Sequence, residues 1–399
     1  MSYLEELLEG VEVEHLPMGD ESIGEFIRGK RFVKTDLISE GVPTIHYGEM
    51  YTHYGTWADK TKSFVSKELV EKKKLRRAEK GDVVIVAAGE TIEDIGQGTA
   101  WLGEEGVVIH DACFYYKSIL NSKYVAYFTR TRQFHNQIRK HIRTGKISAI
   151  NAKGLGKAVI PIPCPNNPEK SLKIQKKIVR ILDTFTELTA ELTAELTARK
   201  KQYSYYREQL LSFNEKEVEN KVLGSLAENL DSMRKPIASG LRKKGTIPYY
   251  GASGIVDYVK DYIFDGEFLL ISEDGANLIA RKTPIAFSIK GKNWVNNHAH
   301  VLRFGTYVER RFVEYYLNSI DLTPYISGAA QPKLNQRNLN SIKIPNPTFL
   351  IKEKIVNILD KFDTLTTSIS EGLPKEIKLR QKQYEYYREK LLTFPKPNI

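Results

Sequence analysis

The sequence predicts an α+β protein: two similar α+β domains separated by two long antiparallel coiled-coil helices, related by pseudo-twofold, cyclic symmetry. Three observations carry this expectation. A helical segment occurs twice, as RKKQYSYYREQLLSF (199–213) and RQKQYEYYREKLLTF (380–394). A second matched pair, 173–188 and 351–365, precedes it. Short β-rich runs and Gly-rich turns fill the stretches between these copies, which is typical of compact α+β domains.

The repeated segments show the apolar spacing of coiled-coil helices. Apolar residues recur in steps of four and three at 174, 178, 181, 185, 188 and 192, and in the second copy at 351, 355, 358, 362, 365 and 369, which predicts a buried seam along each helix. Leu196 follows Leu192 by four residues, a stutter in the seam. Gly372 and Pro374 interrupt the second copy, so we expect a break or kink there.

The edges of the two variable stretches also repeat. INAKGLGKAVIPIP (150–163) aligns with LNQRNLNSIKIPNP (334–347), and EVEHLPMG (12–19) aligns with EVENKVLG (217–224). The N-terminal YLEELL (3–8) resembles YREQLL (206–211), which would close the pattern into a ring. We therefore predict four parts: a first variable domain at 1–165, a helical spacer at 166–214, a second variable domain at 215–348 and a second spacer at 349–399.

Composition favours a polyanionic partner. The 399 residues carry a formal net charge of +11 and a pI near 9.2, which promotes binding to nucleic acid without specifying a fold. No apolar run is long enough to span a bilayer, and the acidic N-terminus lacks a signal-peptide pattern. Cys113 and Cys164 are too few for a disulfide framework, so the sequence predicts a cytoplasmic protein without a membrane partner.

Basic residues gather at matched places in the two variable domains. Between Ala112 and Pro168 there are ten Lys or Arg and no acid, and no acid lies between Asp321 and Glu353 either. The loops 144–153 and 327–337 combine cations with Ser, Asn, Gln and Gly, the mixture that contacts phosphates. The alternative is a solvated basic face. The candidate phosphate-binding residues are Arg143, Lys146, Lys153, Gln331, Lys333 and Arg337.

Candidates for base recognition lie in Gly-rich segments of both domains, because base edges are read by paired donors and acceptors carried on loops. For any single residue, a structural role in an Asx-type turn or a partly buried aromatic cluster is at least as good an interpretation. The candidates are His46, Tyr47, Tyr51 and Tyr54 in the first domain, and Tyr249, Tyr250, Ser253, Asp274, Asn277, Asn296, Asn297 and His298 in the second.

The sequence contains no complete motif for nucleotide binding, zinc binding or methyl transfer. GEFIRGKR (24–31) has the spacing of a phosphate-binding loop, but Arg31 stands where a metal-binding Ser or Thr is required. The pairs His298/His300 and His135/His141 lack companions at zinc-ligand spacing. No Asn/Asp-Pro-Pro-Tyr/Phe stretch of the kind used by amino-methyltransferases occurs. The sequence therefore predicts a chain with no catalytic residues and no bound metal.

Matched residues of the repeated helices point away from the seam. Tyr205 and Arg207 in the first copy, and Tyr386 and Arg388 in the second, fall off the positions that the seam occupies. Tyr and Arg are enriched in protein-contact hot spots, so we expect these four residues to bind partner subunits. Surface ion pairing is the competing interpretation for the two arginines.

Over its whole length the chain resembles the specificity subunit of a type I restriction–modification system. The resemblance is carried by 160–196, 248–259, 296–304 and 372–397, and the tandem TAEL at 189–196 is similar to the type IC-like branch. It implies two target recognition domains that bind a bipartite site in double-stranded DNA, two half-sites around an unspecified spacer. It also implies two modification (methyltransferase) subunits that use S-adenosylmethionine to methylate adenine N6, and restriction (motor–nuclease) subunits that use ATP and Mg. No cofactor is then expected in this chain.

Two other classes of function stay open at this point. One is a stand-alone DNA-modifying enzyme, and the other is a coiled-coil nucleic-acid-binding scaffold outside restriction. Neither the half-site sequences nor the spacer length follows from the residues. The TAEL tetrapeptide does allow a hypothesis: four residues lengthen a helix by about 6 Å and rotate its end by roughly 40°, close to the 34–36° twist of about one base pair. A change in TAEL number would then shift the half-site spacing by about one pair.

Overall fold

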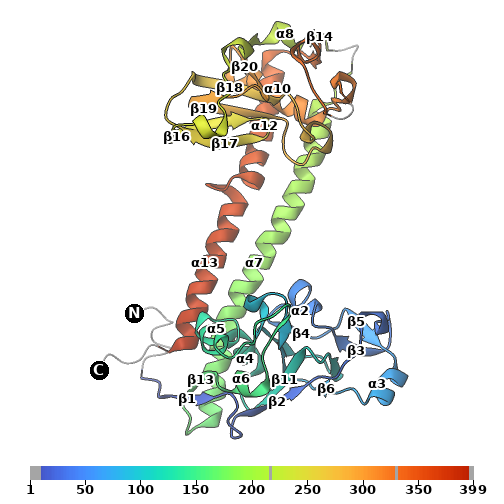
Figure 1. Ribbon diagram of the computed structural model, residues 1–399, viewed down its shortest axis with the longest axis vertical. Helices are drawn as coiled ribbons and strands as arrows, with labels where there is room; N and C mark the ends of the chain where they lie inside the picture. The colour runs from blue at the N-terminus through green and yellow to red at the C-terminus, as the bar shows by residue number, and fades with distance from the viewer. Residues whose placement is uncertain (1–9, 215–217, 329–330, 395–399) are drawn as a thin grey trace. The chain divides into compact units, whose positions relative to one another are not determined.

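The computed structural model describes residues 10–214, 218–328 and 331–394. They form two compact units, Met1–Glu191 with Ile377–Ile399 and Leu192–Glu376 (Figure 1). Helices α7 (Pro168–Leu211) and α13 (Gly372–Thr393) each contribute to both units. The α+β prediction is confirmed. The predicted domain bounds stay a prediction, and the YLEELL match at 3–8 lies outside the described residues.

The first unit is built on two small mixed sheets. The five-stranded sheet has the order β2-β11-β7-β9-β4 and the four-stranded sheet the order β5-β3-β10-β6. All four residues of β7 are buried, because this strand lies inside the larger sheet with a neighbour on each side. The strands are β2 (Gly24–Arg28), β3 (Val42–Ile45), β4 (Trp57–Ala58), β5 (Ser63–Val65), β6 (Arg77–Ala78), β7 (Val83–Val86), β9 (Gly98–Trp101), β10 (Val107–Ile109) and β11 (Cys113–Ser118).

Helices cover the larger sheet and attach it to the repeated helices. One hydrophobic cluster joins β7 and β11 to α4 (Ser122–Phe128), α5 (Arg132–Arg139), the start of α7 and the end of α13. Asn121 and Thr131 begin α4 and α5 by accepting backbone N–H groups with their side chains, the usual role of such N-cap residues.

The second unit is built on one six-stranded sheet with the order β15-β20-β18-β19-β16-β17. Helix α10 (Tyr307–Ser319) and helix α12 (Phe349–Thr367) share a core with it and with the end of α7. A long antiparallel ladder between β18 and β19 forms the middle of the sheet. The strands are β15 (Glu228–Asn229), β16 (Lys244–Gly251), β17 (Gly254–Val259), β18 (Phe264–Ser272), β19 (Ala286–Val295) and β20 (Ala299–Arg303).

The edge repeats of the sequence form matching local structures in the two units. In the first, β1 (Val13–Pro17) pairs antiparallel with β13 (Val159–Pro163); in the second, β14 (Asn220–Val222) pairs antiparallel with β21 (Lys343–Pro345). Asn151 begins the short helix α6 (Ala152–Gly156) and Asn335 begins α11 (Gln336–Asn340), each by accepting a backbone N–H. The two variable stretches are thus framed alike.

The predicted helices form in each unit, but the predicted seam of the second copy is wrong at Ile351, Ile358 and Ile369, which are 44%, 40% and 86% exposed. Ile369 lies in the segment after α12 ends, and the buried face of α12 is made by Ile355, Val356 and Leu359, which pack into the core of the second unit. In the first unit Phe185 of α7 stacks on Tyr387 of α13 at 5.3 Å, and in the second unit Tyr203 of α7 stacks on Phe362 of α12 at 5.9 Å. In both cases the two helices run antiparallel (Figure 1). The expected break is present between α12 and α13, where Gly372 has φ +72°, a conformation that favours glycine.

Matched aspartates of the repeated helices hold the variable domains. In the first unit Asp183 of α7 accepts from Tyr127 at 2.7 Å and pairs with Lys123 at 2.8 Å. In the second, Asp360 of α12 accepts from the Tyr315 hydroxyl at 2.6 Å and from Arg311 Nε at 2.9 Å. Each donor pair is a cation followed four residues later by a tyrosine on one face of a helix.

Candidate nucleic-acid interface

In the first unit a recess of about 500 Å³ brings together two stretches that the sequence singled out. His46 and Tyr47, which follow β3, line one side, and Ile147 of the 144–153 loop lines another. Sequence reasoning missed the rest of the lining, because those residues come from four separate places: β2, the segment after it, the segment at 88–90 and the β10–β11 turn. The missed polar residues are Arg28, Arg31, Lys34, Glu90, His110 and Asp111.

The two histidines of this recess are arranged as neutral rings. Their centroids lie 4.7 Å apart, and burial is the main cause that lowers the pKa of each. His110 Nδ1 accepts from the Ala112 N–H at 3.1 Å while its Nε2 faces the Phe32 carbonyl at 3.0 Å. His46 Nδ1 accepts from the Gly48 N–H at 3.3 Å, which leaves the proton of a neutral ring on Nε2. His46 can therefore donate to a base acceptor with its Nε2.

Two candidate tyrosines support this region from inside. Tyr54 is buried, its hydroxyl accepts from the Lys62 N–H at 2.9 Å, and burial raises its pKa to about 12. The Tyr51 hydroxyl donates to the Ala88 carbonyl at 3.4 Å, and burial raises its pKa as well. The structure therefore gives both side chains a part in holding the loop that carries His46 and Tyr47.

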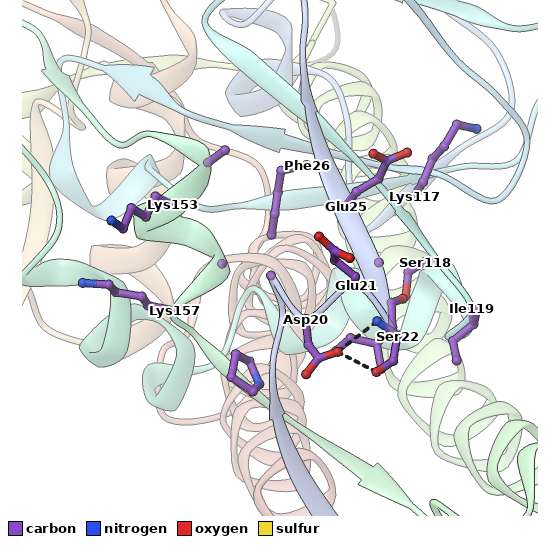
Figure 2. A pocket seen from close by; sticks show the side chains of 16 residues that line it. Asp20, Glu21, Ser22, Glu25, Phe26, Lys117, Ser118, Ile119, Lys153 and Lys157 are labelled. Atoms are coloured by element: carbon purple, nitrogen blue, oxygen red, sulfur yellow. Dashed lines mark hydrogen bonds between the residues drawn. The ribbon is translucent and has the colours of Figure 1, made fainter.

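The candidate cations of the 144–153 loop separate into two places. Arg143 and Lys146 are exposed, and paired backbone bonds between Arg143 and Ala149 at 2.8 and 2.9 Å close the turn that carries Lys146 and Ile147. Lys153 of α6 lines a different recess of about 1060 Å³ (Figure 2). The phosphate-binding role of these cations stays a prediction.

The recess around Lys153 is mixed in charge. Lys153 and Lys157 line it on the α6 side, while Asp20 and Glu21 lie on the segment that leads into β2 and Glu25 lies on β2 itself (Figure 2). Two hydrogen bonds from Ser22 lower the pKa of Asp20 and fix it as an anion. Three lysines here share the recess with three carboxylates, whereas three cations around His46 share theirs with two, Glu90 and Asp111. Because carboxylates oppose a phosphate backbone, the smaller recess around His46 is the better candidate for nucleic-acid contact.

In the second unit three candidate residues from distant loops meet. His298 Nδ1 lies 2.7 Å from Asp274 Oδ2, and Asp274 and Lys333 form an isolated backbone bridge. The Lys333 ammonium pairs with Glu273 at 3.1 Å. The exposed polar edge thus combines an acceptor, an imidazole and a cation. A carboxylate accepts from the cytosine amino group, and the cation suits phosphate.

A buried ionic network fixes these loops from below. His300 Nδ1 lies 2.6 Å from Asp231 and its Nε2 lies 2.7 Å from the Leu334 carbonyl, so both nitrogens face oxygen acceptors. Arg234 pairs with Glu273 at 2.6 Å. Burial alone would raise the pKa of Asp231 and Glu273, but the hydrogen bonds and charges of His300 and Arg234 lower both. Sequence reasoning missed this network, since its members are spread over 231–334.

The other candidates of the second domain divide by exposure. Asn277 exchanges hydrogen bonds with the backbone of Thr283, the turn role that the sequence left open. Asn296 is buried, and its side-chain Oδ1 accepts from the His298 N–H at 2.8 Å. Tyr249 is buried and Tyr250 half-buried. The side chains that face solvent are Ser253, Asn297, Gln331 and Arg337.

Of the four candidate partner-binding residues, the two tyrosines are exposed, whereas the two arginines pack over neighbouring tyrosine rings. Tyr205 and Tyr386 are each 59% exposed, as expected for side chains off the seam. Arg207 lies over the Tyr203 ring at 5.6 Å and Arg388 over the Tyr384 ring at 5.3 Å. Both Nε atoms are buried and have no hydrogen-bond partner within the described part of the chain. A recess of about 600 Å³ opens beside Tyr386.

Comparison with known proteins identifies the family. The model of the type I restriction modification DNA specificity domain matches twice, at residues 19–199 and 215–379. The chain belongs to the type I DNA specificity family. This specificity subunit is 37% identical over 424 residues to the EcoR124I/EcoR124II specificity subunit of Escherichia coli, covering 100% of this chain and 98% of the relative. It is 41% identical over 244 residues to the EcoprrI specificity subunit of E. coli, covering 58% and 59%.

Solved structures support the fold of the specificity subunit. The S subunit of a type I system from M. genitalium matches with a TM-score of 0.56 at 16% identity, covering 98% of both chains. A chain from a study of assembly and conformational transition of the type I system also matches with a TM-score of 0.56, at 12% identity and 96% coverage of both. In the ranges that the structure describes, no helix is both long and apolar enough to cross a membrane.

Proposed function

We propose that this specificity subunit binds a bipartite site in double-stranded DNA, each unit recognising one half-site. The observation that carries the proposal is that the two units share the same flanking strand pair and capped helix but differ in the polar loops between them. The β1–β13 and β14–β21 pairs and the Asn-capped helices match. The polar loops they frame do not: His46 and Tyr47 beside Arg31 and Lys34 in one unit, and the Asp274, His298 and Lys333 group in the other.

We further propose that the chain is a non-catalytic subunit that assembles with two modification subunits and with restriction subunits. S-adenosylmethionine, ATP and Mg would then be bound by those partners. Support comes from the family and from the exposed Tyr205 and Tyr386 at matched positions of the repeated helices. Neither tyrosine side chain is buried in the core of its unit, so both can contact partner proteins.

Methylome sequencing tests the proposal. The chain is expressed in a methylation-free host with its modification and restriction subunits, and N6-methyladenine is mapped across the genome. We expect paired modified adenines in two short half-sites at a fixed gap. Exchange of residues 215–348 for the corresponding domain of a relative should change one half-site and leave the other unchanged. Methylation at single, unpaired sites, or a change in both halves, would contradict the assignment of one half-site to each unit.

The two alternative functions predict different results with the isolated chain. A stand-alone DNA-modifying enzyme would transfer methyl groups from S-adenosylmethionine without its partners, whereas we expect no transfer. A nucleic-acid scaffold outside restriction would protect structured RNA, or DNA of any sequence. We expect two protected patches in DNA that carries the mapped site, and weaker protection as salt rises.

A further inference from the structure

A basic loop of the second unit, residues 234–244, presents an exposed leucine. The stretch between Asp231 and Asp257 has no acidic residue and five cations: Arg234, Lys235, Arg242, Lys243 and Lys244. Leu241 lies between Gly240 and Arg242 and is 76% exposed. Lys243 and Lys244 are exposed beside it. An apolar tip between cations is an unusual surface for a side chain that gains free energy from burial.

The loop is braced, so the exposure of Leu241 is a fixed feature. The Arg242 guanidinium lies 4.5 Å over the ring of Tyr249, its Nε donates to the Ile237 carbonyl at 3.0 Å, and its Nη1 pairs with Asp257 at 3.2 Å. The buried Tyr249 hydroxyl accepts from the Ile237 N–H at 2.9 Å. Trp294 Nε1 donates to the Lys235 carbonyl. Preorganisation of this kind lowers the entropy lost on binding.

The loop lies next to the candidate base-reading edge of the same unit. The Lys235 N–H reaches the carbonyl of Val295 at 3.4 Å, directly before Asn296, whose carboxamide holds His298. The Asn296 N–H in turn donates to Tyr250 at 3.0 Å. The start of the 234–244 loop therefore packs against the strand that leads into the segment carrying His298.

We propose that the 234–244 loop enters the DNA minor groove, that Leu241 wedges against a base step, and that Lys243 and Lys244 bind the flanking phosphates. This rests on the proposed DNA-binding function. Apolar wedges accompanied by cations are the device by which proteins unstack base steps from the minor groove. The loop tip carries no carboxamide for paired hydrogen bonds to a major-groove edge. A protein partner would need carboxylates for the two lysines, whereas DNA supplies phosphates on both sides of the groove.

The test uses the full chain assembled with its modification subunits and DNA that carries the mapped site. 2-Aminopurine is placed in turn at each step in and next to the second half-site, and its fluorescence reports unstacking. We expect one step to brighten on binding. Leu241→Ala should abolish that signal and raise Kd about 10- to 100-fold, from the lost apolar burial, while the salt dependence of binding stays unchanged.

Two further variants and a control make the assignment specific. Leu241→Met keeps an apolar wedge of similar volume and should retain the signal with Kd within about threefold. Lys243→Ala combined with Lys244→Ala should reduce the slope of log K against log salt by about 2. Ile369→Ala is the matched control, because Ile369 is an 86% exposed apolar residue of the same unit that lies in a segment between serines. It should change neither signal nor affinity.

Each contrary outcome has a distinct meaning. If the wild type gives no footprint on any mapped site, the proposed function fails. If the wild type binds its site but no step brightens, or Leu241→Ala binds and brightens as the wild type does, the wedge is wrong and the proposed function stands. If Leu241→Ala instead weakens assembly with the modification subunits and leaves DNA affinity unchanged, the loop contacts protein, and the inference is overturned.

Discussion

Asp360 of α12 is expected to hold the second variable domain on its helix, and Asp360→Asn tests this. The Asp360 carboxylate is 24% exposed, the Arg311 side chain 12%, and Asp360 accepts from Arg311, from Tyr315 and from the Tyr307 hydroxyl. Loss of all charge partners would leave Arg311 as an unpaired buried cation, which costs about 3–5 kcal/mol. Arg311 keeps Glu314 at 2.6 Å and Asp363 at 3.2 Å. The cost should therefore be that of one charged hydrogen bond, about 1.5–3 kcal/mol.

Guanidinium unfolding of the full chain, followed by circular dichroism and by tryptophan fluorescence, measures this cost. We expect the transition of the second unit to shift by that amount while the transition of the first stays in place. Asp363→Asn is the matched control: Asp363 pairs with the same Arg311 but is 37% exposed, so its loss should cost about 0.2–1 kcal/mol. Equal shifts for Asp360→Asn and Asp363→Asn would refute the reasoning that burial sets the strength of this contact.

The remaining predictions concern pH, DNA, partners and the TAEL tetrapeptides. Asp231 and Glu273 have folded pKa values below their ordinary 3.8 and 4.5, so they stabilise the folded state above those values, and this stability is lost as the pH falls through the lower folded pKa values. Urea midpoints measured across that range should fall less steeply for His300→Gln; an unchanged slope would remove His300 as the cause. Arg31→Ala combined with Lys34→Ala should lower the salt slope of DNA binding by about 1–2, whereas Lys153→Ala, in the recess that also holds carboxylates, should leave it nearly unchanged. Tyr386→Ala should weaken binding of a modification subunit by roughly 10- to 30-fold without loss of thermal stability, as measured by calorimetric titration and melting; a variant that melts early but still binds would assign Tyr386 to the fold. One added TAEL should lengthen the gap between methylated adenines by about one base pair, and an unchanged gap would contradict the spacing hypothesis.

The helical architecture was predictable because its rules are local. Heptad spacing predicted α7 and α12, and Gly372 with Pro374 placed the break before α13. The matched Asn151 and Asn335 were visible as a repeat, and their capping role follows from residue type. These features need no knowledge of distant contacts.

The candidate sites were only partly predictable, because they depend on pairing across the chain. Arg28 reaches the recess around His46 through a bond from its Nε to the carbonyl of Asp111, 83 residues away. Tyr54 is buried in a cluster with residues of β7, β9 and β11, and Tyr249 is buried against Arg242 and the backbone of Ile237. Charge runs identified Lys146 and Lys153 but gave no sign that carboxylates from 20–25 would line the same recess as Lys153. The composition of a segment does not show which residues from distant parts of the sequence will lie beside it in the fold.

The paired aspartates bear on how new specificities arise. The acceptors Asp183 and Asp360 sit in the duplicated helices, while the donors Lys123 with Tyr127 and Arg311 with Tyr315 are encoded inside the divergent stretches. Exchange of a variable stretch at the repeated helical segments would therefore leave both acceptors intact. An incoming stretch then needs a cation and a tyrosine one helical turn apart, together with apolar residues that complete the core it shares with the repeated helices. Two independent acceptors let either variable domain be replaced while the helix contacts of the other are unaltered.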